Sequence, residues 1–392
     1  MKVKKAIINI ILITLLIMCM GYGLAYKNNA QSSKTLAAIN IEDTGREAAS
    51  IEEMLNSKEE DNYSFVALKE KDEVIISNEE LKKSTSVKLI SITGNSSILF
   101  RGPILFTDDK DGCLIDKSAA YKLFGDYNVE GMTVQYDGNN YTIRGVIENA
   151  ESSIVIQTKT NSNLEMDLLL LDMNGEDDRY VENFLTKYSL PQNYTTNSVY
   201  YSISNLMTLV LPIIMACIII NKMFKLIRIN KNKPIKKILL ILLTLVFIYF
   251  LYLILNIKFK INYNLIPNEW SDFDYWGDLI SKYSERNREL LFSKKYVIDI
   301  PLIDNMIRSV FCSIVCIITF FILNNRMKPI NIKYLLKILG VIVIIELIAI
   351  YLINKDYNLS NYMIIYLIPY YYVCTYFIEW LINKESYKSV IE

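Results

Sequence analysis

The 392-residue chain contains no histidine, and this absence restricts the chemistry available to it. Without histidine there is neither a Ser-His-Asp triad nor a Cys-His pair, and the imidazole ligands of most zinc sites are missing. The chain also lacks a G-x-x-x-x-G-K-[ST] loop, which would hold the phosphates of a nucleotide. The sequence therefore predicts no catalytic residue, no metal site and no cofactor, and we expect that the protein is not an enzyme.

Cysteine is also scarce, with six residues in the whole chain. Five of them lie in long apolar runs, and Cys113 is the single cysteine of the polar region between residues 27 and 200. That region therefore cannot form an internal disulfide. Cys312 and Cys316 are one helical turn apart, but their apolar setting favours a packing role over metal binding.

Apolar residues are abundant and gather in blocks. They make up 52% of the chain, whose mean hydropathy is +0.22, and this composition is typical of a membrane protein. Six runs approach the ~20 residues that span a bilayer: residues 6–26, 202–221, 238–257, 306–323, 335–353 and 363–382. The first run could be a cleaved signal peptide, but its length and poor cleavage site favour a retained anchor.

Basic residues in the short loops predict the orientation of these six spans. Residues 222–237 contain seven Lys or Arg and no acid, and residues 324–337 contain four and no acid, whereas the loop 258–305 mixes both signs. Basic loops remain in the cytoplasm. We therefore expect a plasma-membrane protein with both termini on the cytoplasmic side, residues 27–200 outside, and Cys113 open to thiol reagents added from outside.

The polar region at residues 27–200 has 17 basic and 29 acidic residues. Its alternating patterns predict strands at residues 64–70, 73–77, 87–93, 153–158 and 167–172, and a helix at residues 177–188. We also expect a helix or helical linker over residues 33–55, and a short helix beginning at the capping-box-like Ser77 to Glu80. The fold class is thus an α+β external domain inserted between the transmembrane helices of a six-span protein.

Residues 112–148 have the clearest local pattern in this domain. An apolar run at residues 113–115 is followed by Asp116, a helix N-cap residue, and by a helix that Gly125 ends in the left-handed conformation. Two alternating segments then flank the turn at residues 137–140, as in a β-hairpin. The sequence predicts a strand, a helix and a hairpin in this order.

This stretch resembles the periplasmic core domain of MacB/FtsX-type ABC transporter permeases. The resemblance is carried by a helix ending in L-F-G-D, a glycine before the first hairpin strand, and a closing strand of the form Y-T-I-R-G-V-I-E. The matching residues are Leu123, Phe124, Gly125, Asp126, Gly131, Tyr141, Ile143, Gly145 and Val146. Two features depart from the family: residues 222–237 lack its R-E-I-G and A-L-G-A patterns, and the chain has two additional spans.

The resemblance implies a permease-like subunit that couples a separate cytoplasmic ABC ATPase to movement of the external domain, for export or mechanotransmission. The expected partners are that ATPase, membrane lipids and a second permease subunit in a homo- or heterodimer, with no nucleic acid. The alternative, from another class, is a membrane-anchored scaffold or sensor that transports nothing and binds an envelope partner.

The expected organisation places the first transmembrane anchor at residues 1–26 and the MacB-like core domain at 27–200. Residues 201–257 hold spans two and three with the basic loop 222–237, residues 258–305 form an external loop, residues 306–383 hold spans four to six, and residues 384–392 form a cytoplasmic tail.

Two groups of residues are candidate sites. The basic loop offers apolar anchors and charge for ATPase docking, at Phe224, Leu226, Ile227 and Arg228. Glu346 lies well inside the fifth span, where an ionised carboxylate is costly, and Tyr371 is its candidate hydrogen-bond partner. Glu346 is either part of a proton or substrate path or a helix–helix hydrogen-bonding residue, and the sequence leaves both open.

Overall fold

The computed structural model describes residues 2–30, 35–57, 63–100, 102–148, 151–230, 233–255, 273–292, 294–327, 331–357 and 362–391. The chain divides into two compact units. One unit combines Met1–Gln31, Tyr200–Asn262 and Ile303–Glu392, and the other combines Ser32–Val199 with Tyr263–Leu302. The first is helical and the second is an α+β unit, and each is described separately below.

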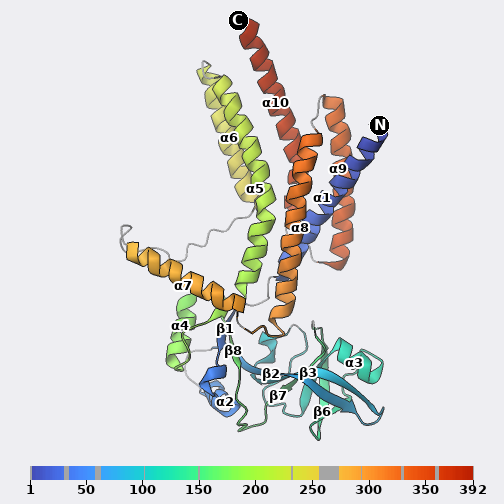
Figure 1. Ribbon diagram of the computed structural model, residues 1–392, viewed down its shortest axis with the longest axis vertical. Helices are drawn as coiled ribbons and strands as arrows, with labels where there is room; N and C mark the ends of the chain where they lie inside the picture. The colour runs from blue at the N-terminus through green and yellow to red at the C-terminus, as the bar shows by residue number, and fades with distance from the viewer. Residues whose placement is uncertain are drawn as a thin grey trace. The chain divides into compact units, whose positions relative to one another are not determined.

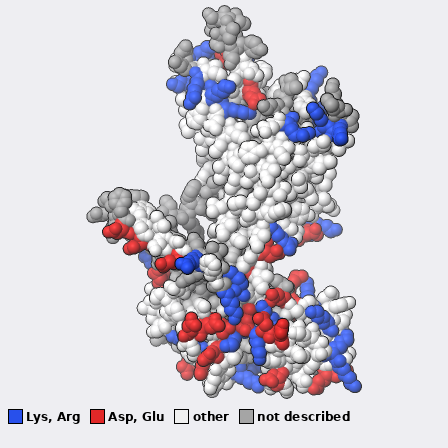
Figure 2. Space-filling view, viewed as in Figure 1, with Lys and Arg blue, Asp and Glu red and all other residues white. Residues whose placement is uncertain are grey.

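Among the residues that the structure describes, the helical unit contains six helices that are long and apolar enough to cross a membrane (Figure 1). They are α1 (Lys2–Ala30), α5 (Ser198–Ile229), α6 (Pro234–Leu255), α8 (Asp299–Arg326), α9 (Ile332–Asp356) and α10 (Leu367–Ile391). Their charged residues gather near the helix ends, while the surface between is almost free of charge on the face shown in Figure 2. The described residues thus confirm the six-span, multi-pass membrane protein predicted from the sequence.

Small residues allow α1 to pack closely between α8 and α9. A Cβ atom at Gly21 would lie 2.4 Å from Cδ1 of Ile353 on α9, and one at Gly23 would lie 3.4 Å from Cβ of Cys312 on α8. Ser309 on α8 donates a 3.0 Å hydrogen bond to the Gly23 carbonyl. Apolar side chains from all six helices join one buried cluster around this contact. Close backbone approach and dispersion therefore hold the bundle together, as expected where lipid is as apolar as the helix surfaces.

The α+β unit is built on a nine-stranded sheet among the described residues, in the order β3-β7-β4-β6-β5-β2-β8-β1-β9, with β2 and β3 also paired. The strands are β1 (Leu36–Asn40), β2 (Phe65–Asn78), β3 (Lys83–Gly94), β4 (Gly112–Asp116), β5 (Thr133–Tyr136), β6 (Asn139–Ile147), β7 (Ser153–Gln157), β8 (Leu168–Asp172) and β9 (Thr195–Thr196). Helices α2 (Ala48–Asn56), α3 (Lys117–Phe124) and α4 (Asp178–Lys187) pack on it, and α7 (Phe273–Phe292) follows later in the chain. The long β2 joins both halves of the sheet because it pairs with β3, β5 and β8.

The strand, helix and hairpin predicted for residues 112–148 are confirmed. Asp116 caps α3 by accepting a 2.7 Å hydrogen bond from the Ser118 amide, and Gly125 ends the helix with a φ of 79°. Strands β5 and β6 pair antiparallel around the turn at Asp137. Gly145 lies where a Cβ atom would meet Pro103 at 2.2 Å, so close packing of the loop before β4 requires a glycine there.

Strand β8 has four consecutive leucines because both of its faces are buried. Leu169 and Leu171 join the cluster under α2 and α4, whereas Leu168 and Leu170 face a second cluster with Val66 and Leu68 of β2. Tyr296 and Val297, which are 4% and 1% exposed, belong to this second cluster. They lie in residues 294–298, here named the docking segment, immediately before α8. Part of the external loop predicted at residues 258–305, namely the docking segment, therefore belongs to the α+β core.

Of two helices predicted for the external region, the first is confirmed only in its last part and the second is wrong. Residues 33–55 include β1, because the alternating Ala37, Ile39 and Ile41 are buried in the sheet, and α2 begins only at Ala48. The short helix expected at residues 77–80 is a hairpin turn between β2 and β3, in which the Asn78 side chain accepts a 2.8 Å hydrogen bond from the Leu81 amide. A side chain suited to capping a helix closes a turn here instead.

The replacement Gly125→Val should destabilise the α+β unit by about 1 kcal/mol or more, because a β-branched residue is strained at positive φ. Thermal unfolding of the full chain, followed by near-ultraviolet circular dichroism, measures this. Gly277→Val is the matched control, since Gly277 is helical, exposed and has open space around its Cα. Equal melting temperatures for both variants would contradict the left-handed cap.

The structure also overturns the expectation that Cys113 is open to thiol reagents. Its side chain is 0% exposed, and burial raises the pKa of the thiol to about 12, so little thiolate is present near neutral pH. Native Cys113 should therefore stay unmodified until the α+β unit is denatured.

The orientation is better tested with two introduced cysteines in a chain without the native ones. Tyr127→Cys, at a position that is 55% exposed in the α+β unit, should react in intact cells with a membrane-impermeant maleimide. Asn383→Cys, at an exposed position on α10, should react only after lysis. Labelling of Asn383→Cys in intact cells would contradict the predicted orientation and place the C-terminus outside.

Candidate functional site

The connection between α5 and α6 is shorter than the sequence suggested. Helix α5 extends to Ile229 and α6 begins at Pro234, so most of the basic segment 222–237 is helical where it is described. Of the four residues predicted to dock an ATPase, Phe224 is 52% exposed, Arg228 is exposed and Ile227 is half-buried. Leu226 is 2% exposed and belongs to the bundle core, so as a surface anchor it is a wrong choice.

The basic residues around this connection pair with glutamates of α10. Lys222 Nζ lies 2.7 Å from Glu379 Oε1, and Lys233 and Lys236 lie 2.9 and 2.8 Å from the two carboxylate oxygens of Glu385. These pairs could not be predicted from the sequence, because the acids lie about 150 residues later in the chain. They tie the ends of α5 and α6 to α10, so a displacement at this end would involve three helices.

Glu346 lies on the buried stripe of α9, with Ile342 and Ala349 a turn away on either side. Its side chain is 0% exposed, and neither carboxylate oxygen has a hydrogen-bond partner among the residues that the structure describes. An unpaired ionised carboxylate in this setting would be costly, so the neutral carboxylic acid is the form that the bundle accommodates.

Tyr371 is not the partner of Glu346. Its hydroxyl donates a 2.7 Å hydrogen bond to Oδ1 of Asn324 on α8, and its ring packs edge-on against Phe320 with centroids 5.1 Å apart. Tyr371 thus connects α10 to α8, and the hydrogen bond predicted between Tyr371 and Glu346 is wrong. The role of Asn324 was not apparent from the sequence, because an asparagine at a span end usually faces water.

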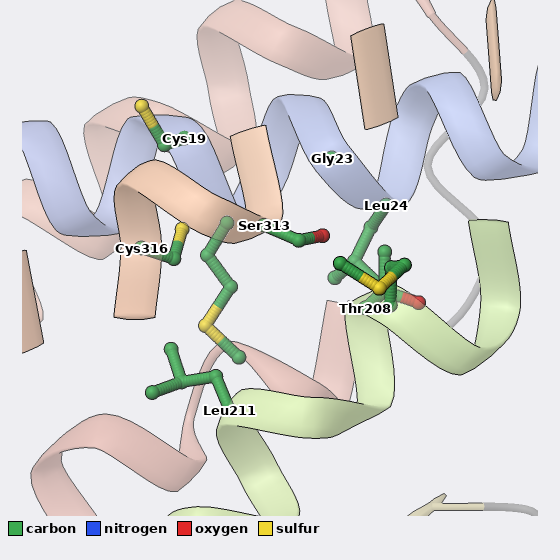
Figure 3. Close-up of a pocket in the computed structure, with 9 residues that line it drawn as sticks. Cys19, Gly23, Leu24, Thr208, Leu211, Ser313 and Cys316 are labelled. Carbon is green, nitrogen blue, oxygen red and sulfur yellow. The ribbon is translucent and has the colours of Figure 1, made fainter. Parts of the chain in front are cut away.

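A small cavity lies between α1, α5 and α8 (Figure 3). Its volume is about 10 Å³, and it is lined by Cys19, Met20, Gly23, Leu24, Met207, Thr208, Leu211, Ser313 and Cys316. The hydroxyls of Thr208 and Ser313 donate to carbonyls of their own helices, at 3.0 and 2.9 Å. The cavity has room for about one water molecule and its hydroxyl donors are already used, so it is a packing feature and not a substrate site.

The docking segment is held by charge as well as by apolar contact. The Val297 amide donates a 2.8 Å hydrogen bond to Oε1 of Glu70 on β2, and Lys294 lies 3.5 Å from Asp167 and above the Tyr296 ring. Burial raises the pKa of the Glu70 carboxyl, against the opposing effects of the Val297 amide and of the Lys88 ammonium 3.6 Å away. A buried carboxyl with two specific partners fixes the segment in one register.

Comparison with known proteins gives a partial result. No family model matches the chain, and no curated protein matches it either. Among solved structures, the periplasmic region of MacB from Actinobacillus actinomycetemcomitans aligns at 14% identity and a TM-score of 0.33, over 43% of this chain and 89% of that one. The extracellular domain of the ABC-type transporter YknZ from Gram-positive bacteria aligns at 17% identity and a TM-score of 0.29, over 41% and 98%. The structural neighbours are thus extracytoplasmic domains of ABC-type transporters, at a distant level of similarity.

The environment of Glu346 predicts a graded response to substitution. Glu346→Gln should preserve abundance and melting temperature, because the amide keeps the shape and adds no charge, whereas Glu346→Lys should prevent accumulation of the folded protein. Quantitative immunoblotting of membranes and thermal melts in detergent measure both. If the lysine variant accumulates like wild type, then the bundle interior is open to water at Glu346, contrary to its burial.

Proposed function

We propose that the chain is the membrane subunit of an ABC-type transport or mechanotransmission complex, in which a separate cytoplasmic ATPase displaces the spans and the α+β unit carries the displacement outside the cell. One observation supports this above the others. Helix α1 leads along the chain into β1, and β9 leads directly into α5, while β1 and β9 are paired neighbours with Ala37 opposite Thr196 and Ala38 opposite Thr195.

The junction between these strands is closed by reciprocal hydrogen bonds. The Leu36 amide donates to Oδ1 of Asn197 at 3.0 Å, and the Asn197 amide donates to the Leu36 carbonyl at 3.2 Å. A displacement of α1 relative to α5 would therefore act on adjacent strands that are joined side by side. Such a joint suits a two-state transition, because hydrogen-bonded strands move as a body and do not deform gradually.

In this proposal the ATPase acts at the end of α5 and the start of α6. Phe224 and Ile227 supply apolar contact, Arg228 supplies charge, and the ion pairs to α10 spread the displacement over three helices. The excess of basic residues here is the reason to place this end, and both termini, on the cytoplasmic side of the membrane, which in this proposal is a bacterial plasma membrane. A permease dimer would supply the second half of the transport path.

The second candidate is a membrane-anchored scaffold or sensor that binds an envelope partner and has no ATPase. The observation that favours it is the pairing of Lys222, Lys233 and Lys236 with Glu379 and Glu385. These pairs give the basic residues a role within the chain, so they need no partner protein to explain them.

The double variant Phe224→Ser with Ile227→Ser distinguishes the permease subunit from the scaffold or sensor. The double variant should insert normally yet lose co-purification of an ABC ATPase, because buried apolar anchors supply most docking energy. The measurement is affinity purification in mild detergent from the native host, with proteomic identification of ATPases and assay of stimulated ATP hydrolysis.

Ile203→Ser is the matched control, since Ile203 is 38% exposed at the corresponding depth from the opposite end of α5. It should retain the ATPase. If no ABC ATPase accompanies the wild-type chain, or if the double variant binds one as wild type does, the account of ATPase docking fails and the scaffold or sensor is favoured.

A further inference from the structure

The docking segment gives the α+β unit an additional covalent connection to the helices. Helix α1 precedes β1 and α5 follows β9, so both of these connections reach the end of the sheet order at β1 and β9. The docking segment instead joins the buried cluster that contains Val66 and Leu68 of β2 and Leu168 and Leu170 of β8, and its Val297 amide donates a hydrogen bond to Glu70 of β2. It therefore contacts the strands where the two halves of the sheet meet.

The docking segment and the first turn of α8 form one structure. The Tyr296 amide donates to Oδ2 of Asp299 at 3.2 Å, and the Asp299 amide donates to the Tyr296 carbonyl at 2.9 Å. Because of these two hydrogen bonds, the buried segment continues into the helix without an intervening unbonded linker. The α+β unit accordingly extends to Leu302, and α8 continues without interruption to Arg326.

We infer that α8 acts as a third lever on the α+β unit, with Tyr296 and Val297 as the positioning residues that transmit its displacement to β2 and β8. This inference rests on the proposed function, in which the spans are displaced. Because β2 pairs with β3, β5 and β8, a load applied there reaches both halves of the sheet, whereas a load from α1 or α5 enters at its end.

The chemistry of the segment suits this role. Tyr296 and Val297 supply buried apolar surface, and burial raises the pKa of the Tyr296 hydroxyl, which stays neutral. The Glu70 carboxylate holds the segment through the Val297 amide, and Asp167 holds it through Lys294. Apolar burial resists withdrawal, and the directional bonds resist sliding along the strands.

The test uses the full chain in lipid nanodiscs, with its native cysteines replaced and spin labels on two introduced ones. Ile75→Cys places one label on β2 and Ile307→Cys places the other on α8, at positions that are 68% and 57% exposed. The distance distribution between them is measured by pulsed electron paramagnetic resonance. Insertion of Gly-Ser-Gly-Ser between Ile298 and Asp299 should broaden it, because four flexible residues add about 10 Å of reach.

A second variant tests the same inference without an insertion, in case the insertion itself disturbs folding. Tyr296→Ala with Val297→Ser should broaden the distribution by undocking the segment, whereas Ile280→Ser, at a 69% exposed position on α7, should leave it as in wild type. Broadening in both test variants supports the inference. A distribution that is unchanged from wild type in either correctly folded variant overturns it.

The same preparations separate this inference from the proposed function. If an ABC ATPase is recovered with the chain, the insertion should reduce stimulated ATP hydrolysis or its coupling, while leaving ATPase binding intact. Broadening without any recovered ATPase would support α8 as a lever and count against the permease. If an ATPase is recovered and the insertion does not change its stimulated hydrolysis, the proposed permease function is retained and the inference that α8 transmits the displacement is contradicted.

Discussion

The burial of β8 on both faces is the constraint on which the α+β unit depends. Four consecutive leucines cannot be left half-exposed, and α2 and α4 cover only one side of the strand. The other side lies in a second buried cluster, to which Tyr296 and Val297 contribute from about 125 residues further along the chain, at an expected gain of about 1.5–3 kcal/mol for each large apolar side chain that is buried. Folding of the unit is thus tied to the segment that begins α8.

This constraint changes how the chain is divided. A soluble domain between the first two spans would end near residue 200, as the sequence pattern suggested, but the described structure returns to the same core after α7. The helices are therefore connected to the sheet through α1, α5 and α8, and the docking segment that precedes α8 contacts β2. A unit held at several points is suited to carrying displacement, and the same connections would serve a sensor that reports binding in the opposite direction.

Local patterns were predicted well because they depend on neighbouring residues. Asp116 and Gly125 mark the ends of α3 through backbone geometry that only a few residue types provide, and the six apolar runs follow from bilayer thickness. Long-range contacts were missed. The pairing of Tyr371 with Asn324, and of Lys233 with Glu385, joins helices whose mutual rotation is set by packing, and no periodicity in one helix encodes it. The uninterrupted leucines of β8 were the signal in the sequence that both faces of this strand are buried by other parts of the chain.

The central claim is that the docking segment and β8 form one cooperative unit, and hydrogen exchange of the wild-type chain in nanodiscs tests it most directly. The account predicts that the Val297 amide, bonded to Glu70, exchanges as slowly as the amides of Leu169 and Leu171, and that destabilising the unit with low denaturant accelerates all three together. Exchange of Val297 at the rate of an open loop, while β8 remains protected, would contradict the account.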